Sequence, residues 1–320
     1  MNKLESLKKI TKVVADTCNI DSLKSYDIDG VTTNPSLILE VLKNEKCQSI
    51  IDESIKFALR KSIFLEKRIK YAYNKFLIKM GVEILKCISG RISTEIDVNF
   101  SYDKEKSIEE AKRIIELYEE ENINKDRILI KLAATWQGIC AAEKLEKEGI
   151  NCNLTLVFSL AQALSCAESG VYAVSPFVGR IMDWYKFNTS ISNKESLKHP
   201  GIEFVENVYN SYKRNGYKTN IIGASIRDIN EVIQLAGCDY LTIPINIIKD
   251  LRELKGKIYR NLRYVGQIVK KKTSTKENDF YWNHNFNIMA STKLSEGIQK
   301  FFFDQEKLKK HIAKKIINFI

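Results

Sequence analysis

The sequence predicts an α/β protein with a (β/α)8 TIM barrel and additional helices, including C-terminal helices. Two observations favour this fold. About eight short strand-like runs recur along the 320 residues, and a segment of helical period follows each run. The chain is also 44% hydrophobic, and no low-complexity linker or change of composition divides it. We therefore expect a single domain with a sizeable core over residues 1–320.

The expected strands are short runs of apolar and β-branched residues. Lys131 interrupts the most apolar of these runs, since Leu129 and Ala133 share its face in a pleated strand. The alternation of strand and helix predicts that all of the strands run parallel. The eight strands are expected at residues 12–17, 30–34, 91–98, 128–133, 152–158, 171–177, 220–225 and 240–245.

Three segments depart from simple alternation. Residues 37–87 are long enough for two or three helices, and the basic stretch 56–79 within them has the period of an amphipathic helix pair. Residues 186–201 are expected as a loop. After the last strand, residues 255–272 and 292–319 have helical character, and the polar and aromatic residues 274–287 are expected to join them.

The net charge of +11 raises the question of a nucleic-acid partner. Lysine and glutamate alternate along residues 103–127, however, which is typical of a solvated helix face and argues against such a partner. No apolar run approaches the length that crosses a bilayer, and the N-terminus has no signal-peptide pattern. We therefore expect a cytoplasmic protein without a membrane partner. The seven cysteines form no C-x-x-C pair and are expected to be reduced thiols.

Polar side chains recur near the C-terminal ends of the predicted strands. In a parallel barrel the active site lies at these ends. Each residue alone is more often a helix N-cap or a turn former, but their recurrence around a ring favours a site. The polar residues at these positions are Asp16, Asn34, Glu95, Asn153, Thr155, Ser175, Ser225 and Arg227, and the aromatic Phe177 shares the face of Ser175 on its strand.

Lys131 would point into the middle of this ring. One alternative is a lysine at a strand end whose ammonium reaches water. The other alternative is a buried lysine. Burial disfavours the charged ammonium, so that the neutral amine can attack a carbonyl carbon as a Schiff-base nucleophile. Asp16 and Glu95 are available to move protons and to steer water. The sequence has no H-E-x-x-H, dinucleotide or P-loop motif, which argues against a metal site and against a nucleotide cofactor.

Over almost its whole length the chain resembles the transaldolases of the classical pentose-phosphate type. The motifs that carry the resemblance include "VVADT", "TTNPSLIL", "GRISTEIDV", "ILIKLAATWQGICAAEKLEKEGINCNLTLVFS", "SPFVGRIMDWYK" and "KLSEGIQKFFFDQEKL". The resemblance implies a cofactor-free, cytoplasmic, homodimeric class I aldolase-type barrel. Such an enzyme transfers a dihydroxyacetone unit from sedoheptulose 7-phosphate to glyceraldehyde 3-phosphate, giving erythrose 4-phosphate and fructose 6-phosphate.

The resemblance also implies roles for individual residues. Lys131 would form the Schiff base, and Asp16 would handle the proton of the cleaved hydroxyl. Glu95 and Thr155 would hold the water that forms and opens the imine. The dihydroxyacetone hydroxyls would bind to Asn34, Asn153 and Ser175. The sugar phosphate would bind to Arg180, Ser225 and Arg227, where a planar guanidinium suits bidentate contact.

The chain departs from the family pattern at Ala134, Asn99 and Cys18, where a serine, a basic residue and a glycine are common. Two other functions stay open. One is a simple aldolase on the same barrel that releases free dihydroxyacetone. By the resemblance, the presence of Glu95, Thr155 and Phe177 favours transfer over this simple cleavage. The other is a non-catalytic basic barrel that binds nucleic acid, whose binding would weaken steeply with salt.

Overall fold

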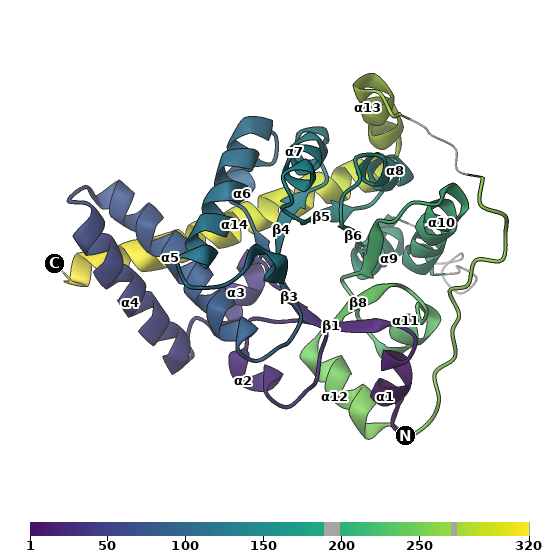
Figure 1. Cartoon of the computed structure of the whole chain (residues 1–320), viewed down its shortest axis with the longest axis horizontal. Helices are drawn as coiled ribbons and strands as arrows, with labels where there is room; N and C mark the ends of the chain where they lie inside the picture. The colour runs from purple at the N-terminus through teal and green to yellow at the C-terminus, as the bar shows by residue number, and fades with distance from the viewer. Residues whose placement is uncertain (189–198, 270–273, 320) are drawn as a thin grey trace.

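A closed barrel of eight parallel strands forms the centre of the computed structural model, which describes residues 1–188, 199–269 and 274–319 (Figure 1). Each strand pairs with its neighbour in sequence, and β8 closes the barrel on β1. The predicted fold is confirmed, and every strand lies within its predicted range. The strands are β1 (Lys12–Asp16), β2 (Gly30–Thr32), β3 (Arg91–Glu95), β4 (Ile128–Ala133), β5 (Cys152–Val157), β6 (Ala173–Pro176), β7 (Asn220–Gly223) and β8 (Tyr240–Ile243).

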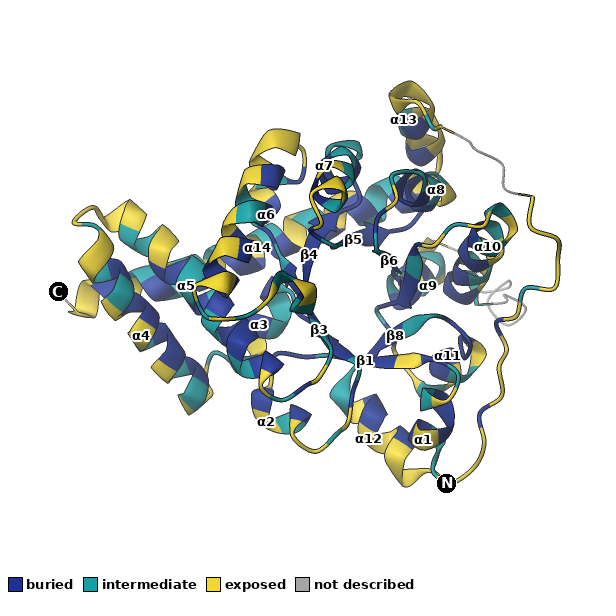
Figure 2. Ribbon diagram, viewed as in Figure 1, coloured by how far each residue is buried: buried dark blue, intermediate teal, exposed yellow. Residues whose placement is uncertain are grey.

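Helices surround the strands and bury the outer face of the barrel, so that β4 and β5 are buried along their whole length. Figure 2 shows that the helix faces turned towards the strands are buried and that the outer faces are exposed. The helices around the barrel are α1 (Lys3–Lys8), α2 (Ile20–Leu23), α6 (Lys104–Glu119), α7 (Trp136–Lys147), α8 (Leu160–Glu168), α9 (Val178–Asn188), α10 (Pro200–Asn215), α11 (Ile229–Gln234) and α12 (Ile245–Glu253), with short 3-10 turns at Val98–Phe100 and Lys125–Arg127.

The long insertion between β2 and β3 forms three helices, as its length predicts. They are α3 (Pro35–Val41), α4 (Glu45–Lys61) and α5 (Leu65–Leu85). The predicted amphipathic pair corresponds to α4 and α5, which pack on each other beside the barrel and bury Ile55 and Phe76 completely (Figure 1). This hairpin provides the surface on which the end of the chain docks.

The last helix, α14 (Ile288–Phe319), runs across the barrel and ends beside α4 and α5 (Figure 1). Its second half buries Leu308, Ile312 and Ile316 completely among the core residues. Its first half contributes Leu294 and Phe301 to a separate apolar cluster that contains Phe177. The prediction of a helix near the C-terminus is therefore confirmed, and α14 brings distant residues to the barrel.

The expected helix over residues 255–272 is wrong for the part that the structure describes. Residues 257–269 contain no helix. The N–H groups of Asn261 and Leu262 instead donate to the carbonyl oxygen of Ala236, at 2.7 and 2.9 Å, so tertiary contacts take the donors that a helix would use. The polar and aromatic stretch after it is helical instead, as α13 (Glu277–Phe286), because Phe280 and His284 bury against the barrel helices.

The expected loop over residues 186–201 falls mainly on residues 189–198, which lie outside the described residues. Of the described part, residues up to Asn188 continue α9, and His199 caps α10. Among the helices that the structure describes, none is both long enough and apolar enough to cross a membrane.

Candidate active site

A cavity of about 160 Å³ opens at the C-terminal ends of the strands. Nine of the eleven site residues expected from the sequence line it, and they come from or directly follow six of the eight strands. The two others, Glu95 and Asn153, each accept a hydrogen bond from a lining residue: Glu95 from Lys131 and Asn153 from Ser175. The nine lining residues are Asp16, Asn34, Lys131, Thr155, Ser175, Phe177, Arg180, Ser225 and Arg227.

Lys131 is the fourth residue of β4 and is only 4% exposed. The strand register sets Glu95 and Asn153 beside it on the two neighbouring strands. Its Nζ donates to the carbonyl oxygen of Thr33 at 3.0 Å and lies 3.4 Å from Oε2 of Glu95. The expected burial of this lysine is confirmed, and a lysine that reaches solvent is excluded. Glu95 is thus a carboxyl group within hydrogen-bond distance of the amine.

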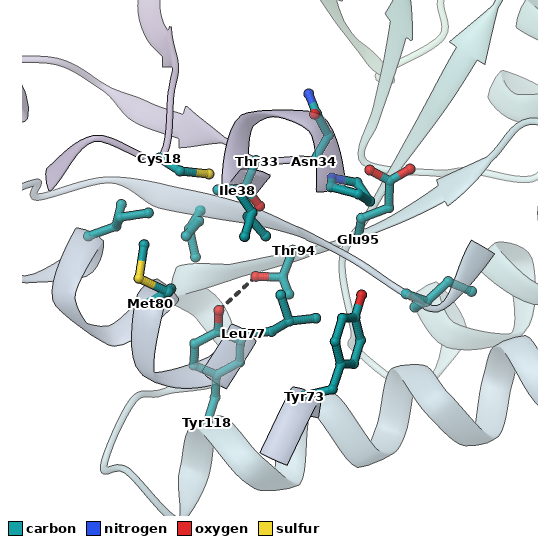
Figure 3. Close-up of a pocket in the computed structure, with 15 residues that line it drawn as sticks. Cys18, Thr33, Asn34, Ile38, Tyr73, Leu77, Met80, Thr94, Glu95 and Tyr118 are labelled. Carbon is teal, nitrogen blue, oxygen red and sulfur yellow. Dashed lines mark hydrogen bonds between the residues drawn. The ribbon is translucent and has the colours of Figure 1, made fainter. Parts of the chain in front are cut away.

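Glu95 ends β3 with its side chain 8% exposed. Burial raises the pKa of the Glu95 carboxyl, and the neighbouring Lys131 opposes that rise. Figure 3 shows the pocket behind it, where Glu95 and Asn34 direct their polar groups to one side, away from Leu77 and Met80. This apolar backing explains the rise, because it keeps water from one side of the carboxyl group.

Asp16 ends β1, and its Oδ1 accepts a hydrogen bond of 2.9 Å from the hydroxyl of Thr32. Burial raises the pKa of the Asp16 carboxyl, while the charge of Lys131 and the bond from Thr32 lower it. A carboxyl group whose pKa is raised towards neutrality can both accept and return a proton. Asp16 is therefore suited to general acid and base chemistry in this cavity.

Two buried polar residues fix the orientation of the groups beside Lys131. The hydroxyl of Ser175 donates to Oδ1 of Asn153 at 2.8 Å, and Nδ2 of Asn153 donates to Ser93 at 3.1 Å. Because the single hydrogen of Ser175 is used in this way, its oxygen is left to accept a hydrogen bond from a ligand hydroxyl. Asn153 is completely buried and supports Ser175 from below.

The hydroxyl of Thr155 lines the cavity but has no hydrogen-bond partner among the described residues. A buried hydroxyl normally finds a partner, so this one marks a place for water or a ligand. Asn34 uses its Oδ1 to cap α3 through the N–H of Leu37 at 3.0 Å. Its amide N–H groups are therefore the ones that it can offer to a ligand.

Arg180 lies between two aromatic rings near the mouth of the cavity. Its guanidinium lies 4.9 Å from the centre of the Phe177 ring and 5.3 Å from that of Phe301. Burial lowers the pKa of Arg180, and the positive charge of Arg227 adds to this effect. Two cations held close together favour the binding of an anion between them.

Arg227 and Ser225 follow β7 at the rim of the cavity. The Arg227 side chain is 53% exposed and pairs with Asp183 at 2.9 Å. Ser225 has a φ of +61°, and its carbonyl accepts the N–H of Gly179 at 3.0 Å. An added Cβ at Gly179 would lie 2.3 Å from that carbonyl oxygen, so the close approach of the two loops requires glycine there.

Sequence reasoning missed three polar lining residues, Thr32, Thr242 and Lys300. The two threonines lie late in β2 and β8, so the rule that identified the other strand-end residues could have found them. Lys300 belongs to α14, and nothing in its local sequence indicates that this helix crosses the barrel mouth. Among the described residues, no group of three His, Cys, Asp or Glu side chains is arranged to hold a metal ion.

Comparison with known proteins gives consistent matches. The profile of the family described as Transaldolase/Fructose-6-phosphate aldolase matches residues 13–312. Proteins named Transaldolase from Photorhabdus laumondii and Yersinia pseudotuberculosis are each 51% identical over 312 residues, which is 98% of this chain and 98% of each relative. A protein of the same name from Glaesserella parasuis is 50% identical over 308 residues, or 96% of this chain and 98% of the relative.

Proposed function

The chain belongs to the transaldolase/fructose-6-phosphate aldolase family, and we propose that it acts as a transaldolase through a Schiff base on Lys131. A transaldolase moves a dihydroxyacetone unit from sedoheptulose 7-phosphate to glyceraldehyde 3-phosphate, giving erythrose 4-phosphate and fructose 6-phosphate in the pentose phosphate pathway. The observation that carries the site assignment is the contact of a buried lysine amine with a buried carboxylate, 3.4 Å apart, at the end of a barrel strand.

In the first step the amine of Lys131 adds to the ketone carbon of the donor, and the resulting carbinolamine loses water to give an iminium ion. Glu95 accepts the proton that the ammonium must lose before attack. The unpartnered hydroxyl of Thr155 supports a site for the water that leaves here and returns to hydrolyse the imine. The raised pKa of Glu95 suits these transfers, because the carboxyl can hold a proton temporarily.

Asp16 acts in the cleavage step. Its carboxylate takes the proton of the donor C4 hydroxyl while the C3–C4 bond breaks, and the bond electrons flow into the iminium to give an enamine on Lys131. The aldehyde product then leaves and an acceptor aldehyde enters. The enamine carbon attacks the acceptor carbonyl, and Asp16 returns the proton to the new hydroxyl. The oxygen of Ser175 and the amide of Asn34 are suited to hold the three-carbon unit between these steps.

The phosphate group of each sugar binds at the mouth of the cavity, in this proposal. Arg180 and Arg227 supply paired guanidinium groups, and Ser225 adds a hydroxyl. The exposed Lys300 adds a third cation at the same rim. The net charge of +11 helps to draw anionic sugars to this surface. From the family resemblance we also propose that the enzyme is a cytoplasmic homodimer that needs no cofactor.

Borohydride reduction tests the proposal directly. When the protein is incubated with fructose 6-phosphate and then reduced, peptide mass spectrometry should find a three-carbon adduct on Lys131. The variant Lys131→Met should give no adduct and no turnover. Addition of erythrose 4-phosphate before the reductant should lower the amount of trapped adduct and produce sedoheptulose 7-phosphate, because the acceptor removes the three-carbon unit.

Two results would contradict parts of this proposal. An adduct on another lysine, or none, would reject Lys131 as the nucleophile. Steady release of free dihydroxyacetone from fructose 6-phosphate, without any demand for an acceptor, would indicate a simple aldolase on the same barrel.

A further inference from the structure

A chain of hydroxyl groups connects the carboxylate of Asp16 with the neighbouring strands of the barrel. We infer that Thr242 and Thr32 are positioning residues that hold Asp16 in one proton-accepting orientation, with Oδ1 bound from behind and Oδ2 left to exchange the proton with the sugar. This inference rests on the proposed role of Asp16 in cleavage. It adds two residues that lie next to the reacting groups.

The hydrogen-bonded chain of Asp16, Thr32 and Thr242 spans three adjacent strands. β1 lies between β2 and β8, and the register sets Asp16 opposite Thr32 and Val14 opposite Thr242. The Thr32 hydroxyl lies 2.9 Å from Oδ1 of Asp16 and 2.5 Å from the hydroxyl of Thr242. Both threonines are 3% exposed, so water does not compete freely for these bonds.

The number of hydrogen atoms fixes the direction of the chain. A threonine hydroxyl has one hydrogen to donate and two lone pairs that accept. Thr32 gives its hydrogen to the Asp16 carboxylate, so Thr242 must donate in its contact with Thr32. A proton placed on Oδ1 would weaken the hydrogen bond that this oxygen accepts from Thr32, because a protonated carboxyl oxygen is a poorer acceptor than a carboxylate oxygen. A proton placed on Oδ2 leaves the chain unchanged, and this oxygen is therefore the one that accepts it at least cost.

The charges around Asp16 determine how the loss of these threonine hydroxyl groups would affect the reaction. Burial raises the pKa of Asp16, and the influences that lower it are Lys131, the Thr32 hydroxyl, Arg180 and Arg227. The other titratable groups that act across this space are Glu95 and Cys18. Removal of the Thr32 hydroxyl deletes one lowering influence, so the pKa of Asp16 should rise further. Since cleavage uses the carboxylate, activity should then be lost at a higher pH as the solution is acidified.

The test compares Thr32→Val and Thr242→Val with Thr32→Ser. Valine keeps the shape and strand preference of threonine but has no hydroxyl, and serine keeps the hydroxyl. The rate of fructose 6-phosphate cleavage with an acceptor is measured across pH. For Thr32→Val we expect the acid limb of kcat to move up by about one pH unit and kcat to fall about tenfold at the wild-type optimum, with KM changed much less. Thr242→Val should shift the limb in the same direction by less, because it acts through Thr32.

Thr32→Ser should restore the wild-type pH profile. Unchanged pH profiles in both valine variants, or a serine variant as impaired as the valine variant, would overturn the inference. Borohydride trapping of a six-carbon or a three-carbon adduct on Lys131 in each variant confirms that the barrel is folded, because the six-carbon imine forms before the cleavage step that uses Asp16. If the wild-type protein neither forms the adduct nor transfers the three-carbon unit, the proposed function fails, which is a different result from an unchanged pH profile in an active enzyme.

Discussion

Arg180 and Arg227 are both placed to bind phosphate but differ in how firmly they are held. Arg180 stacks between Phe177 and Phe301, which fixes its guanidinium. Arg227 is largely exposed, and its side chain forms an ion pair with Asp183. An exposed ion pair contributes little to stability. We therefore expect Arg227 to affect substrate binding far more than it affects folding.

Replacement of Arg227 with alanine should raise KM for the phosphorylated donor at least tenfold, because a charged hydrogen bond to phosphate is lost. Steady-state kinetics with fructose 6-phosphate and with its unphosphorylated analogue measure this difference. KM for the unphosphorylated analogue should be almost unchanged. An equal rise for both substrates would show that Arg227 does not recognise phosphate.

Lys300→Gln offers a graded comparison at the same rim. Its effect on KM should have the same sign as that of Arg227→Ala but be smaller, about two- to fivefold, because Lys300 is exposed and acts mainly through a screened charge. Added salt should therefore reduce the difference between Lys300→Gln and the wild-type protein.

At the scale of elements, α14 links the stability of the fold to the site. Its second half packs Leu308 and Ile312 into the main core, and its first half sets Phe301 against Arg180 at the mouth of the cavity. The helix therefore has a structural half and a half that supports substrate binding. Substitutions in the two halves should have different effects.

A pair of variants separates these roles. Phe301→Leu keeps most of the buried volume and should cost about 1 kcal/mol of stability, but KM for phosphorylated sugars should rise about three- to tenfold because Arg180 loses one aromatic face. Leu308→Ala should cost about 2–5 kcal/mol through the cavity that it creates, with KM almost unchanged. Thermal unfolding and kinetics, measured where both variants are folded, test this. An unchanged KM in Phe301→Leu would show that α14 does not hold Arg180 for binding.

At the scale of the whole molecule, we propose that two copies of the chain associate. Sedimentation equilibrium should give a mass of twice the 36.9 kDa of one chain, at micromolar concentration and moderate salt. The activity per chain should be the same across this range, because one chain supplies Lys131, Asp16 and the other residues that line the cavity. A mass of one chain at all concentrations tested would reject the homodimer.

The barrel and most of the candidate site could be predicted from the amino-acid sequence. The short strand period and the alternation with helices are local signals that the sequence carries. Because a parallel barrel places the C-terminal ends of its strands at one mouth, the sequence also predicts that Asp16, Glu95 and Lys131 lie near one another. The same reasoning failed for residues 255–272, because the N–H groups of Asn261 and Leu262 bond to Ala236 and not within a helix.

The features that join residues far apart in the chain depend on tertiary packing. Thr242 follows Thr32 by 210 residues, yet their hydroxyl groups meet behind Asp16. Phe301 and Lys300 reach the mouth because α14 packs across the barrel. No periodicity in the sequence encodes such contacts, since they depend on how completed elements pack against one another. The direction of the hydrogen bonds to Asp16, and with it the oxygen expected to carry the proton, follows from that packing together with the single hydrogen that each hydroxyl can donate.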